Sequence, residues 1–402
     1  MLLYSLIYSL LLPIFIIRTI IKDKNSLRQK LGFGYKKHNL PIHIHCVSVG
    51  EFNASIPLID KFLEFNQVVI TTTTKTGAKA CKNHYKNKVS HYYFPFDLQF
   101  FCKRFIKNIN PEISIILETE IWPNFIAVNK KHNIKTVLIN ARLSDKSYNG
   151  YKKFQKFTIN TLNKLDFITT QDKFSDDNFK KLGVKNSTIC GNIKFDIKVK
   201  IDSNKLNIIN SIINKRAIVV CGSTHKNEEK ILVDSYQKNP CNSLLVLIPR
   251  HPNRFKEVEN LLIKKNVNYI KQSDNSPCSA KTQILLADSM GFVIEYYSRC
   301  DAAFIGGSLV ATGGHNMLES IALKKLTISG KWTFNFKHLV QNLTKSKSYI
   351  CIDNSDELFD IIKNIEKDKE FYQETISNSF TFLTSNTGAT ENIFKKIIKL
   401  FN

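Results

Sequence analysis

The sequence lacks the short motifs that mark several common enzyme classes. It contains no GxGxxG fingerprint and no GxxxxGK(S/T) loop, which disfavours NAD-dependent oxidoreductases and ATP-hydrolysing P-loop enzymes. Its nine cysteines form no CxxC pair, so the spacing favours reduced, packed thiols over a disulfide framework or a zinc site. His43 and His45 alternate along one apolar run without a third ligand nearby. We interpret them as structural, and we expect neither a metal nor another cofactor.

Acidic residues are scarce relative to basic ones. The 402 residues include 58 Lys and Arg but only 34 Asp and Glu, which gives a formal net charge of +24. Residues 1–200 carry +18 of this charge and residues 201–402 carry +6. Such an excess indicates an anionic partner, such as nucleic acid, a membrane surface or a phosphorylated substrate. Only eight of the basic residues are Arg, and Lys, Ile and Asn are abundant, so part of the excess reflects the codon usage of an AT-rich genome.

The N-terminus has no charged residue before Arg18. Residues 1–17 are mostly Leu, Ile, Tyr and Phe, and a run of this length is at the short end of the roughly 17–25 residues that span a bilayer. Positive charge follows the run, with Arg18 and Lys22 where a signal peptide would be cleaved. We therefore expect residues 1–21 to form an uncleaved, single-pass inner-membrane anchor with the rest of the chain in the cytoplasm. The alternative is a helix that is buried or lies in the membrane interface.

The rest of the chain alternates short apolar runs with stretches of helical periodicity. Its 43% hydrophobic and 23% charged residues exclude a disordered chain and a polytopic membrane protein. The alternation predicts an α/β fold of two Rossmann-like domains that face a cleft, at 22–200 and 201–402, with a linker at Lys198–Asn214. We expect the last helix to pack back on the N-terminal domain. The predicted strands are Ile42–Val49, Val68–Thr73, His91–Phe94, Ile113–Leu117, Thr136–Ile139, Phe167–Thr170, Ser187–Ile189, Ala217–Cys221, Leu244–Ile248, Ile284–Leu286, Ala302–Ile305, Leu326–Ile328 and Tyr349–Ile352.

Carboxylates follow two of the strands in the first half. Glu51 comes after the first strand at the start of a helix, where it either acts as a general base or merely favours the helix dipole. Glu118 and Glu120 follow another strand, and one of them is expected to cap the next helix. Arg142 either binds an anion or pairs with one of these two carboxylates. Lys194 lies beside the linker, where it is suited to a negatively charged substrate.

The second half carries signals for phosphate binding. Ser223, Thr224 and His225 follow a strand and precede a helix, an arrangement that suits a phosphate but also an ordinary helix cap. Gly307 and Ser308 lie in a glycine turn that lets a ligand approach the backbone closely. These are possible phosphate or substrate contacts, together with Arg142.

These motifs resemble one family. They are similar to the 3-deoxy-D-manno-octulosonic acid (Kdo) transferases, which are membrane-anchored glycosyltransferases of the GT-B fold, and the likeness extends from about Ile20 to about Leu343. The segments that carry the resemblance are Ser48–Glu51, Thr72–Gly77, Phe94–Leu98, Glu118–Asn124, Asn140–Ser144, Gly191–Asp196, Ser223–His225, Pro249–Pro252, Gly306–Leu309, Gly314–Asn316 and Thr333–Phe336.

The resemblance implies transfer of Kdo from CMP-Kdo to a lipid A precursor, without a metal, at the cytoplasmic face of the inner membrane. It implies that Glu51 is the general base of an inverting reaction, and that Glu118 and Lys194 stabilise the transition state. The implied CMP-Kdo contacts are Pro249, Arg250, Met290, Gly291, Phe292, Asn316, Met317, Leu318 and Glu319.

Several positions depart from the family pattern and leave details of nucleotide contact open, among them Ser320 and the segment Ser329–Trp332. Phe292 stands where the family usually has Glu, and Met317 stands where it usually has Pro. Two other readings of the chain remain as well. One is a GT-B enzyme or epimerase that uses another nucleotide sugar. The other is a non-catalytic basic protein that binds an anionic membrane or nucleic acid, although no nucleic-acid-binding motif is present and we expect no nucleic-acid partner.

Overall fold

The computed structural model describes residues 1–213, 215–365 and 367–401. The chain forms two compact units. Unit 1 consists of Met1–Asp196 and Asn386–Asn402, and unit 2 consists of Ile197–Ser385. Each unit contains one seven-stranded sheet in which every pairing is parallel. The α/β fold with two Rossmann-like domains is therefore confirmed.

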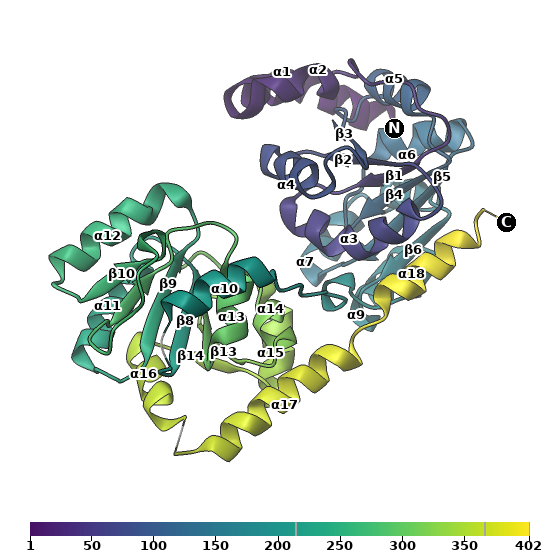
Figure 1. The fold of residues 1–402 in the computed structure, drawn as a ribbon. Coiled ribbons are helices and arrows are strands. Elements are labelled where there is room, and N and C mark those ends of the chain that lie inside the picture. The colour runs from purple at the N-terminus through teal and green to yellow at the C-terminus, as the bar shows by residue number, and fades with distance from the viewer. Residues whose placement is uncertain (214, 366, 402) are drawn as a thin grey trace. The chain divides into compact units, whose positions relative to one another are not determined.

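In unit 1, helices cover both faces of the sheet (Figure 1). Its central strands are buried along their whole length, as expected for parallel strands that are covered on both faces. The strand order is β3-β2-β1-β4-β5-β6-β7. The strands are β1 (Ile42–His45), β2 (Val68–Thr72), β3 (Ser90–Tyr93), β4 (Ile113–Leu117), β5 (Lys135–Ala141), β6 (Phe167–Thr170) and β7 (Ser187–Ile189).

The helices of unit 1 include one that comes from the far end of the chain. They are α1 (Leu2–Asp23), α2 (Leu27–Lys30), α3 (Val49–Leu63), α4 (Lys75–Tyr85), α5 (Gln99–Ile109), α6 (Pro123–Lys131), α7 (Asp145–Lys152), α8 (Gln155–Leu162), α9 (Lys173–Leu182) and α18 (Ala389–Ile398), with 3₁₀ turns η1 (Lys24–Ser26) and η2 (Ile193–Phe195). The C-terminal α18 buries Ile393 and Ile397 in the unit 1 core. Its start is fixed by Asp196, whose carboxylate accepts a hydrogen bond from the Gly388 N–H at 2.6 Å.

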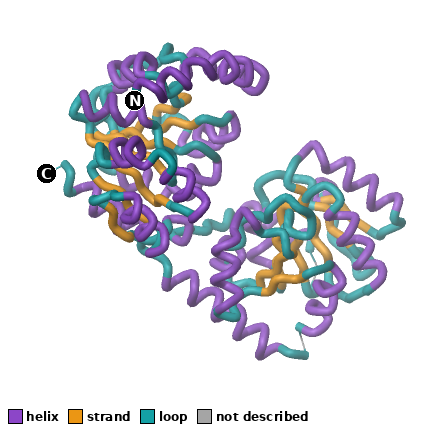
Figure 2. Tube along the Cα trace, turned by 180° about the vertical axis from the view of Figure 1, so that it is seen from behind, coloured by secondary structure: helices purple, strands orange, loops and turns teal. Residues whose placement is uncertain are grey.

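Unit 2 repeats the layered arrangement, with helices on both sides of its strands (Figure 2). The strand order is β10-β11-β9-β8-β12-β13-β14. The strands are β8 (Ile218–Thr224), β9 (Leu244–Pro249), β10 (Tyr269–Lys271), β11 (Ile284–Leu286), β12 (Ala302–Ile305), β13 (Leu326–Gly330) and β14 (Ile350–Ile352). The helices are α10 (Ser203–Ile212), α11 (Glu228–Lys238), α12 (Phe255–Lys264), α13 (Val293–Arg299), α14 (Leu318–Ala322), α15 (Lys337–Lys345), α16 (Ser355–Asn364) and α17 (Lys369–Ser385), with 3₁₀ turns η3 (Pro252–Arg254), η4 (Gln272–Asp274) and η5 (Phe334–Phe336).

The first predicted strand, Ile42–Val49, is too long, because β1 ends at His45 and Val49 already begins α3 after the Ser48 cap. Two further elements differ from the sequence prediction. The segment expected to be a linker contains α10, whose first N–H groups are capped by the Asp202 carboxylate and whose Ile209 and Ile212 are buried. Asn214, at the end of that predicted linker, lies outside the described residues. The edge strand β10 was not predicted, because its three residues are only half-buried and the segment has no long apolar run.

The strand orders fix where a ligand would bind. In unit 1 the order reverses between β1 and β4, and in unit 2 it reverses between β8 and β12. At such a reversal the connections leave in opposite directions and open a crevice at the carboxyl ends of the strands. Glu51 follows β1 and Glu118 follows β4, while His225 follows β8 and the Gly306–Ser308 turn follows β12. The predicted site motifs thus flank both reversals.

Candidate active site

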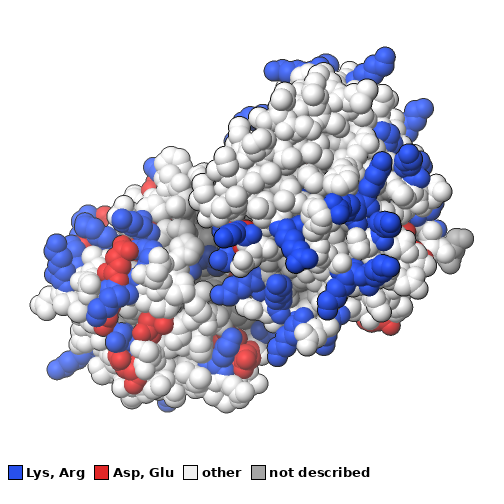
Figure 3. Space-filling model, turned by 90° about the horizontal axis from the view of Figure 1, so that it is seen from above, with Lys and Arg blue, Asp and Glu red and all other residues white. Residues whose placement is uncertain are grey.

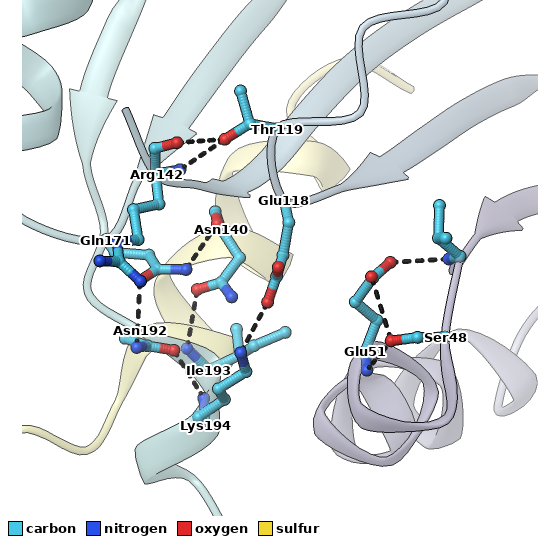
Figure 4. Close-up of polar contacts among 11 residues, drawn as sticks. Ser48, Glu51, Glu118, Thr119, Asn140, Arg142, Gln171, Asn192, Ile193 and Lys194 are labelled. Atoms are coloured by element: carbon cyan, nitrogen blue, oxygen red, sulfur yellow. Dashed lines mark hydrogen bonds and ion pairs between the residues drawn. The ribbon is translucent and has the colours of Figure 1, made fainter. Parts of the chain in front are cut away.

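Glu51 is held at the start of α3 by its own helix cap. The Ser48 hydroxyl accepts a hydrogen bond from the Glu51 N–H at 3.4 Å and donates one to Glu51 Oε1 at 3.2 Å. The Val47 N–H donates to Glu51 Oε2 at 2.7 Å (Figure 4). This reciprocal arrangement satisfies N–H groups that a helix start leaves without partners, and it fixes the position of the carboxylate.

The Glu51 carboxyl is suited to exchange a proton near neutral pH. Burial and then the negative charge of Glu118 raise its pKa from 4.5 to about 7. Hydrogen bonds from Val47 and Ser48 and the positive charge of Lys194 act in the opposite direction. A general base works best when its pKa lies near the working pH, so Glu51 combines a fixed position with a suitable basicity.

Glu118 forms an ion pair with Lys194. Glu118 Oε1 lies 2.7 Å from Lys194 Nζ, and both side chains remain about one third exposed (Figure 4). Glu118 has a left-handed backbone with a φ of 56°, a conformation that costs a non-glycine residue about 1–3 kcal/mol and that concentrates at functional sites. The tight turn after β4 therefore directs this carboxylate toward η2.

Lys194 is positioned by a chain of hydrogen bonds from neighbouring strand ends. The Asn192 side chain accepts from the Lys194 N–H at 3.0 Å, and its amide donates to Gln171 at 3.2 Å. Asn140, at the end of β5, accepts from the Ile193 N–H at 3.1 Å (Figure 4). Asn192 is thereby tied to the residue after β6 and Ile193 to the end of β5, so η2 presents Lys194 at the carboxyl edge of the sheet.

Glu120 is a third carboxyl group in this cluster. Burial raises its pKa to about 7, with further contributions from the charges of Glu51 and Glu118. The expectation that Glu118 or Glu120 caps the next helix is wrong. Asp97 takes that place, since its carboxylate accepts from the N–H groups of Asn124 and Phe125 at 3.0 and 2.7 Å.

Arg142 does not take the pairing partner that the sequence suggested. The cation beside Glu118 is Lys194, whereas the Arg142 side chain is exposed. Only the Arg142 backbone takes part in the polar contacts of this edge, where its N–H donates to the Thr119 hydroxyl at 3.1 Å.

In unit 2, two histidines meet across the reversal point. His225 Nε2 and His315 Nε2 lie 2.7 Å apart, and their rings are stacked at a centroid distance of 5.0 Å. His251 lies edge-on to His225 at 5.8 Å. Burial lowers the pKa of His315 to about 4, with further lowering by Arg250 and the other two histidines. Burial also lowers the pKa of His225, so both rings favour the neutral form at pH 7, in which one ring can donate a hydrogen bond to the other.

The glycine turn of unit 2 is occupied from within the protein. The buried Glu228 carboxylate accepts from the N–H groups of Gly307, Ser308 and Leu309 at 2.6, 3.0 and 2.9 Å. The Ser308 hydroxyl accepts from the Gly330 N–H, and the buried Thr224 hydroxyl donates to Glu229 at 2.8 Å. Gly307, Ser308 and Thr224 are thus engaged internally, and we leave them out of the candidate phosphate contacts.

The remaining nucleotide candidates lie after β9, before α13 and at the start of α14. Arg250 is exposed directly after the buried Pro249. Asn316 donates to Glu319 at 3.3 Å, and burial raises the pKa of Glu319. Met317 and Leu318 are buried, so only their backbone is available to a ligand.

The loop Met290–Phe292 is held by Lys205 of α10. Lys205 Nζ donates to the Gly291 carbonyl at 2.7 Å and lies 5.4 Å from the centre of the Phe292 ring. Gly291 has a φ of 82°, which favours glycine. Phe292 therefore offers an aromatic face and not the carboxylate that the family pattern has at this place.

Comparison with known proteins identifies the family. Residues 25–197 match the model of the 3-deoxy-D-manno-octulosonic-acid transferases. Over 386 residues the chain is 34% identical to the 3-deoxy-D-manno-octulosonic acid transferase of Haemophilus influenzae, covering 92% of this chain and 90% of that protein. The chain belongs to the Kdo transferase family. It is also 28% identical over 419 residues to the transferase of that name from Rickettsia bellii, with 99% of both chains covered.

The fold likeness extends to sugar-nucleotide enzymes outside this family. The UDP-GlcNAc 2-epimerase of Neisseria meningitidis superimposes with a TM-score of 0.59 over 90% of this chain and all of that chain, at 12% identity. At that identity the likeness shows the GT-B-like fold alone. This protein is thus a Kdo glycosyltransferase with a fold that it shares with other nucleotide-sugar enzymes.

Within this Kdo transferase, the structure brings some of the predicted site residues together and leaves others apart. Glu51, Glu118 and Lys194 interact electrostatically in unit 1. Sequence reasoning did not select Glu120, His251 or His315. The alternation of Glu118 and Glu120 was a usable signal for the first, whereas the histidine pair depends on residues 90 positions apart. Among the described residues, no group of three or more His, Cys, Asp or Glu side chains could hold a metal ion.

Proposed function

We propose that this enzyme transfers Kdo from CMP-Kdo to the lipid A precursor lipid IVA, with inversion of configuration. The observation that carries the proposal is the Glu51 carboxyl, which has a pKa of about 7 and a fixed position beside the Glu118–Lys194 ion pair. A buried base next to a cation suits the activation of a hydroxyl nucleophile.

In the proposed reaction, Glu51 accepts the proton of an acceptor hydroxyl as that oxygen bonds to the anomeric carbon of Kdo. The bond from this carbon to the CMP phosphate breaks on the opposite face, and CMP leaves with the bonding electron pair. Lys194 stabilises the negative charge that develops, and Glu118 holds Lys194 in place through their 2.7 Å contact. Each step uses groups that the chain itself supplies.

Unit 2 would bind the donor. Arg250 supplies a cation for the phosphate, and Glu319 supplies a buried carboxyl for the ribose hydroxyls, with Asn316 orienting it at 3.3 Å. Phe292 would contact the nucleotide through its ring or backbone. The neutral pair of His225 and His315 lies near the charge of Arg250 and offers hydrogen bonds to the donor.

Unit 1 would bind the acceptor at the membrane. Residues 1–200 carry +18 of the net charge of +24, which suits a phosphorylated glycolipid and an anionic inner-membrane surface better than a neutral acceptor. Within the described part of the chain, one helix, beginning at Leu2, is long and apolar enough to cross a membrane. We place the two units on the cytoplasmic side, because basic residues follow that helix.

Product analysis tests the identity of the sugar donor. Purified enzyme is incubated with a tetraacyl bisphosphorylated acceptor and either CMP-Kdo or a panel of UDP-sugars, and the lipids are examined by mass spectrometry. We expect a mass increase of one or more Kdo residues with CMP-Kdo alone. Modification only by a UDP-sugar, or release of an epimerised UDP-sugar without lipid modification, would contradict the proposal.

Glu112 provides a matched control for the base. It precedes β4 at the opposite end from Glu118, and its carboxylate accepts from Asn66 at 3.2 Å. The Glu112→Gln variant should transfer Kdo normally, whereas Glu51→Gln should bind CMP-Kdo normally and lose about 10²–10⁴ in the transfer rate. Normal turnover by Glu51→Gln would remove Glu51 from the mechanism.

A further inference from the structure

Helix α1 has two faces with opposite surroundings. One face turns toward unit 1 and carries Tyr4, Tyr8, Phe15 and Thr19, at spacings that return to the same side of a helix. The other face is exposed and apolar along the length of the helix, with Leu2, Leu6, Leu10, Ile14, Ile17 and Ile21 among its members. Tyr4 and Thr19 thus turn their hydroxyl groups toward the protein while these six aliphatic side chains point away from it, which is the reverse of a helix on a water-facing surface.

The inward face is attached to unit 1 from one end to the other. The Tyr4 hydroxyl donates to Asp97 Oδ2 at 2.9 Å, and the Ser5 hydroxyl donates to Asn124 Oδ1 at 3.0 Å. Farther along, the Phe15 ring stacks on Phe96 at a centroid distance of 6.4 Å, and Thr19 is buried. Contacts from Tyr4 to Thr19 cover about 22 Å of helix at a rise of about 1.5 Å per residue.

The partner of Tyr4 is part of the fold of unit 1. Asp97 is fully buried, and the same carboxylate accepts from the first N–H groups of α6 at Asn124 and Phe125. A transmembrane α1 would have to leave this surface, which would break both hydroxyl contacts and carry Tyr4 and Ser5 into or across the hydrocarbon. The contacts therefore favour the in-plane alternative over a single-pass span.

The exposed face fits the interface of an anionic bilayer. Helix α1 is about 33 Å long at a rise of about 1.5 Å per residue. Figure 3 views the molecule from the side on which α1 lies and shows a broad surface almost free of charge, bordered by Lys and Arg. A groove of about 230 Å³ on α1 has Ile14, Ile17 and Ile21 in its lining, with Arg18 and Lys22 beside them. Apolar walls with adjacent cations match the acyl chain and phosphate of a phospholipid.

A second segment with an exposed aromatic ring lies beside the start of α1. Phe157 of α8 stacks on Tyr4 at a centroid distance of 5.8 Å, so α8 lies beside the start of α1. Phe154, just before α8, is 70% exposed and lies among Lys152, Lys153 and Lys156. An exposed aromatic ring among lysines is typical of segments that enter the headgroup region.

We propose that α1 lies in the plane of the membrane, with its aliphatic face among the acyl chains of anionic phospholipids and its hydroxyl face on unit 1. The N-terminus then stays on the same side of the bilayer as the two units. This inference rests on the membrane location proposed above, but it does not depend on the identity of the sugar donor or the acceptor.

Topology in intact membranes tests the proposal directly. Full-length protein with a short epitope tag at either end is examined by protease digestion of spheroplasts and of inside-out vesicles. We expect both tags to be protected in spheroplasts and both to be digested in inside-out vesicles. An N-terminal tag that is digested in spheroplasts, with the C-terminal tag protected, would show a spanning helix and overturn the proposal.

Vesicle binding identifies what covers the exposed face. The double variant Leu10→Glu, Ile14→Glu changes two exposed residues, and Ile263→Glu changes an exposed residue of α12 as the control. Sedimentation with phosphatidylethanolamine–phosphatidylglycerol vesicles should fall at least tenfold for the double variant and remain unchanged for the control. Equal vesicle binding by all three proteins would overturn the proposal. It would also be overturned if the unaltered protein formed a dimer without detergent and the double variant lost this dimer but not vesicle binding, because a second copy would then cover the exposed face.

Kdo transfer to a detergent-dispersed acceptor separates this inference from the proposed function. We expect the double variant to retain that activity within about twofold, because α1 supplies none of the proposed catalytic or donor-binding groups. If the unaltered enzyme transferred no Kdo, the proposed function would be wrong. The orientation of α1 is decided separately, by the tag positions and by vesicle binding.

Discussion

Replacing Glu51 by Gln should stabilise the folded protein above pH 7 and leave its stability near pH 4 almost unchanged. The pKa of this carboxyl is about 7 in place of 4.5, because burial and then the charge of Glu118 disfavour the ionised form. Between these values the folded protein keeps a proton that the unfolded chain has lost. The corresponding stability is fully present below pH 4.5 and is lost as the pH rises through 7.

The size of this effect follows from the change in pKa. At about 1.4 kcal/mol per pH unit, a pKa of about 7 in place of 4.5 means that ionised Glu51 costs the folded state roughly 3 kcal/mol. Gln keeps an oxygen that can accept from the Val47 N–H and carries no charge at any pH. We therefore expect the variant to gain about 1–3 kcal/mol in free energy of unfolding at pH 8, and close to nothing at pH 4.

Tryptophan fluorescence can follow unit 1 alone. The chain has two tryptophans, Trp122 in unit 1 and Trp332 in unit 2, so a Trp332→Phe background leaves Trp122 as the reporter. Urea denaturation is measured at pH 4 and pH 8 for three proteins in this background, which are the parent with Glu51 intact, the Glu51→Gln variant and the Glu112→Gln control. Equal stability of all three proteins at pH 8, or a less stable Glu51→Gln variant, would show that ionised Glu51 does not destabilise the folded protein.

Other perturbations have expected outcomes that can be checked separately. Glu118→Gln should move the acidic limb of the kcat/KM profile down by roughly 0.5–1 pH unit. The variant removes a negative charge that raises the pKa of Glu51, and it leaves unpaired the Lys194 cation, whose charge lowers that pKa. An unshifted limb would argue against this coupling between Glu118 and Glu51. Lys205→Ala should raise the KM for CMP-Kdo severalfold with little change in kcat, since it frees the Gly291 carbonyl and the Phe292 ring. A change confined to kcat would contradict that assignment.

The strands could be predicted because parallel strands buried on both faces form apolar runs. The half-buried edge strand β10 has no such run and was missed. The segment of α10 has the composition of a linker, because Asn and Ser dominate its exposed positions. The signal that reveals it is the spacing of Ile209 and Ile212, together with the cap at Asp202.

The site could be located from the sequence, but its contacts could not. Glu51, Glu118 and Lys194 were selected by strand position and family resemblance, yet the choice between Lys194 and Arg142 as the partner of Glu118 depends on how η2 folds back. The sequence of the glycine turn after β12 predicts N–H groups that are free to bind a phosphate. Its N–H groups are instead filled by Glu228, which in the sequence is merely an acidic residue near the start of a helix.

The central claim is that Glu51 accepts the proton of the acceptor hydroxyl, and single-turnover kinetics test it most directly. The rate of Kdo transfer is measured with saturating CMP-Kdo for the unaltered enzyme and for Glu51→Gln, alongside equilibrium binding of the donor. If Glu51 is the base, the Glu51→Gln variant should lose about 10²–10⁴ in the transfer rate, which is the usual contribution of general base catalysis, and should bind the donor with unchanged affinity. A transfer rate within threefold of the unaltered enzyme would contradict this claim.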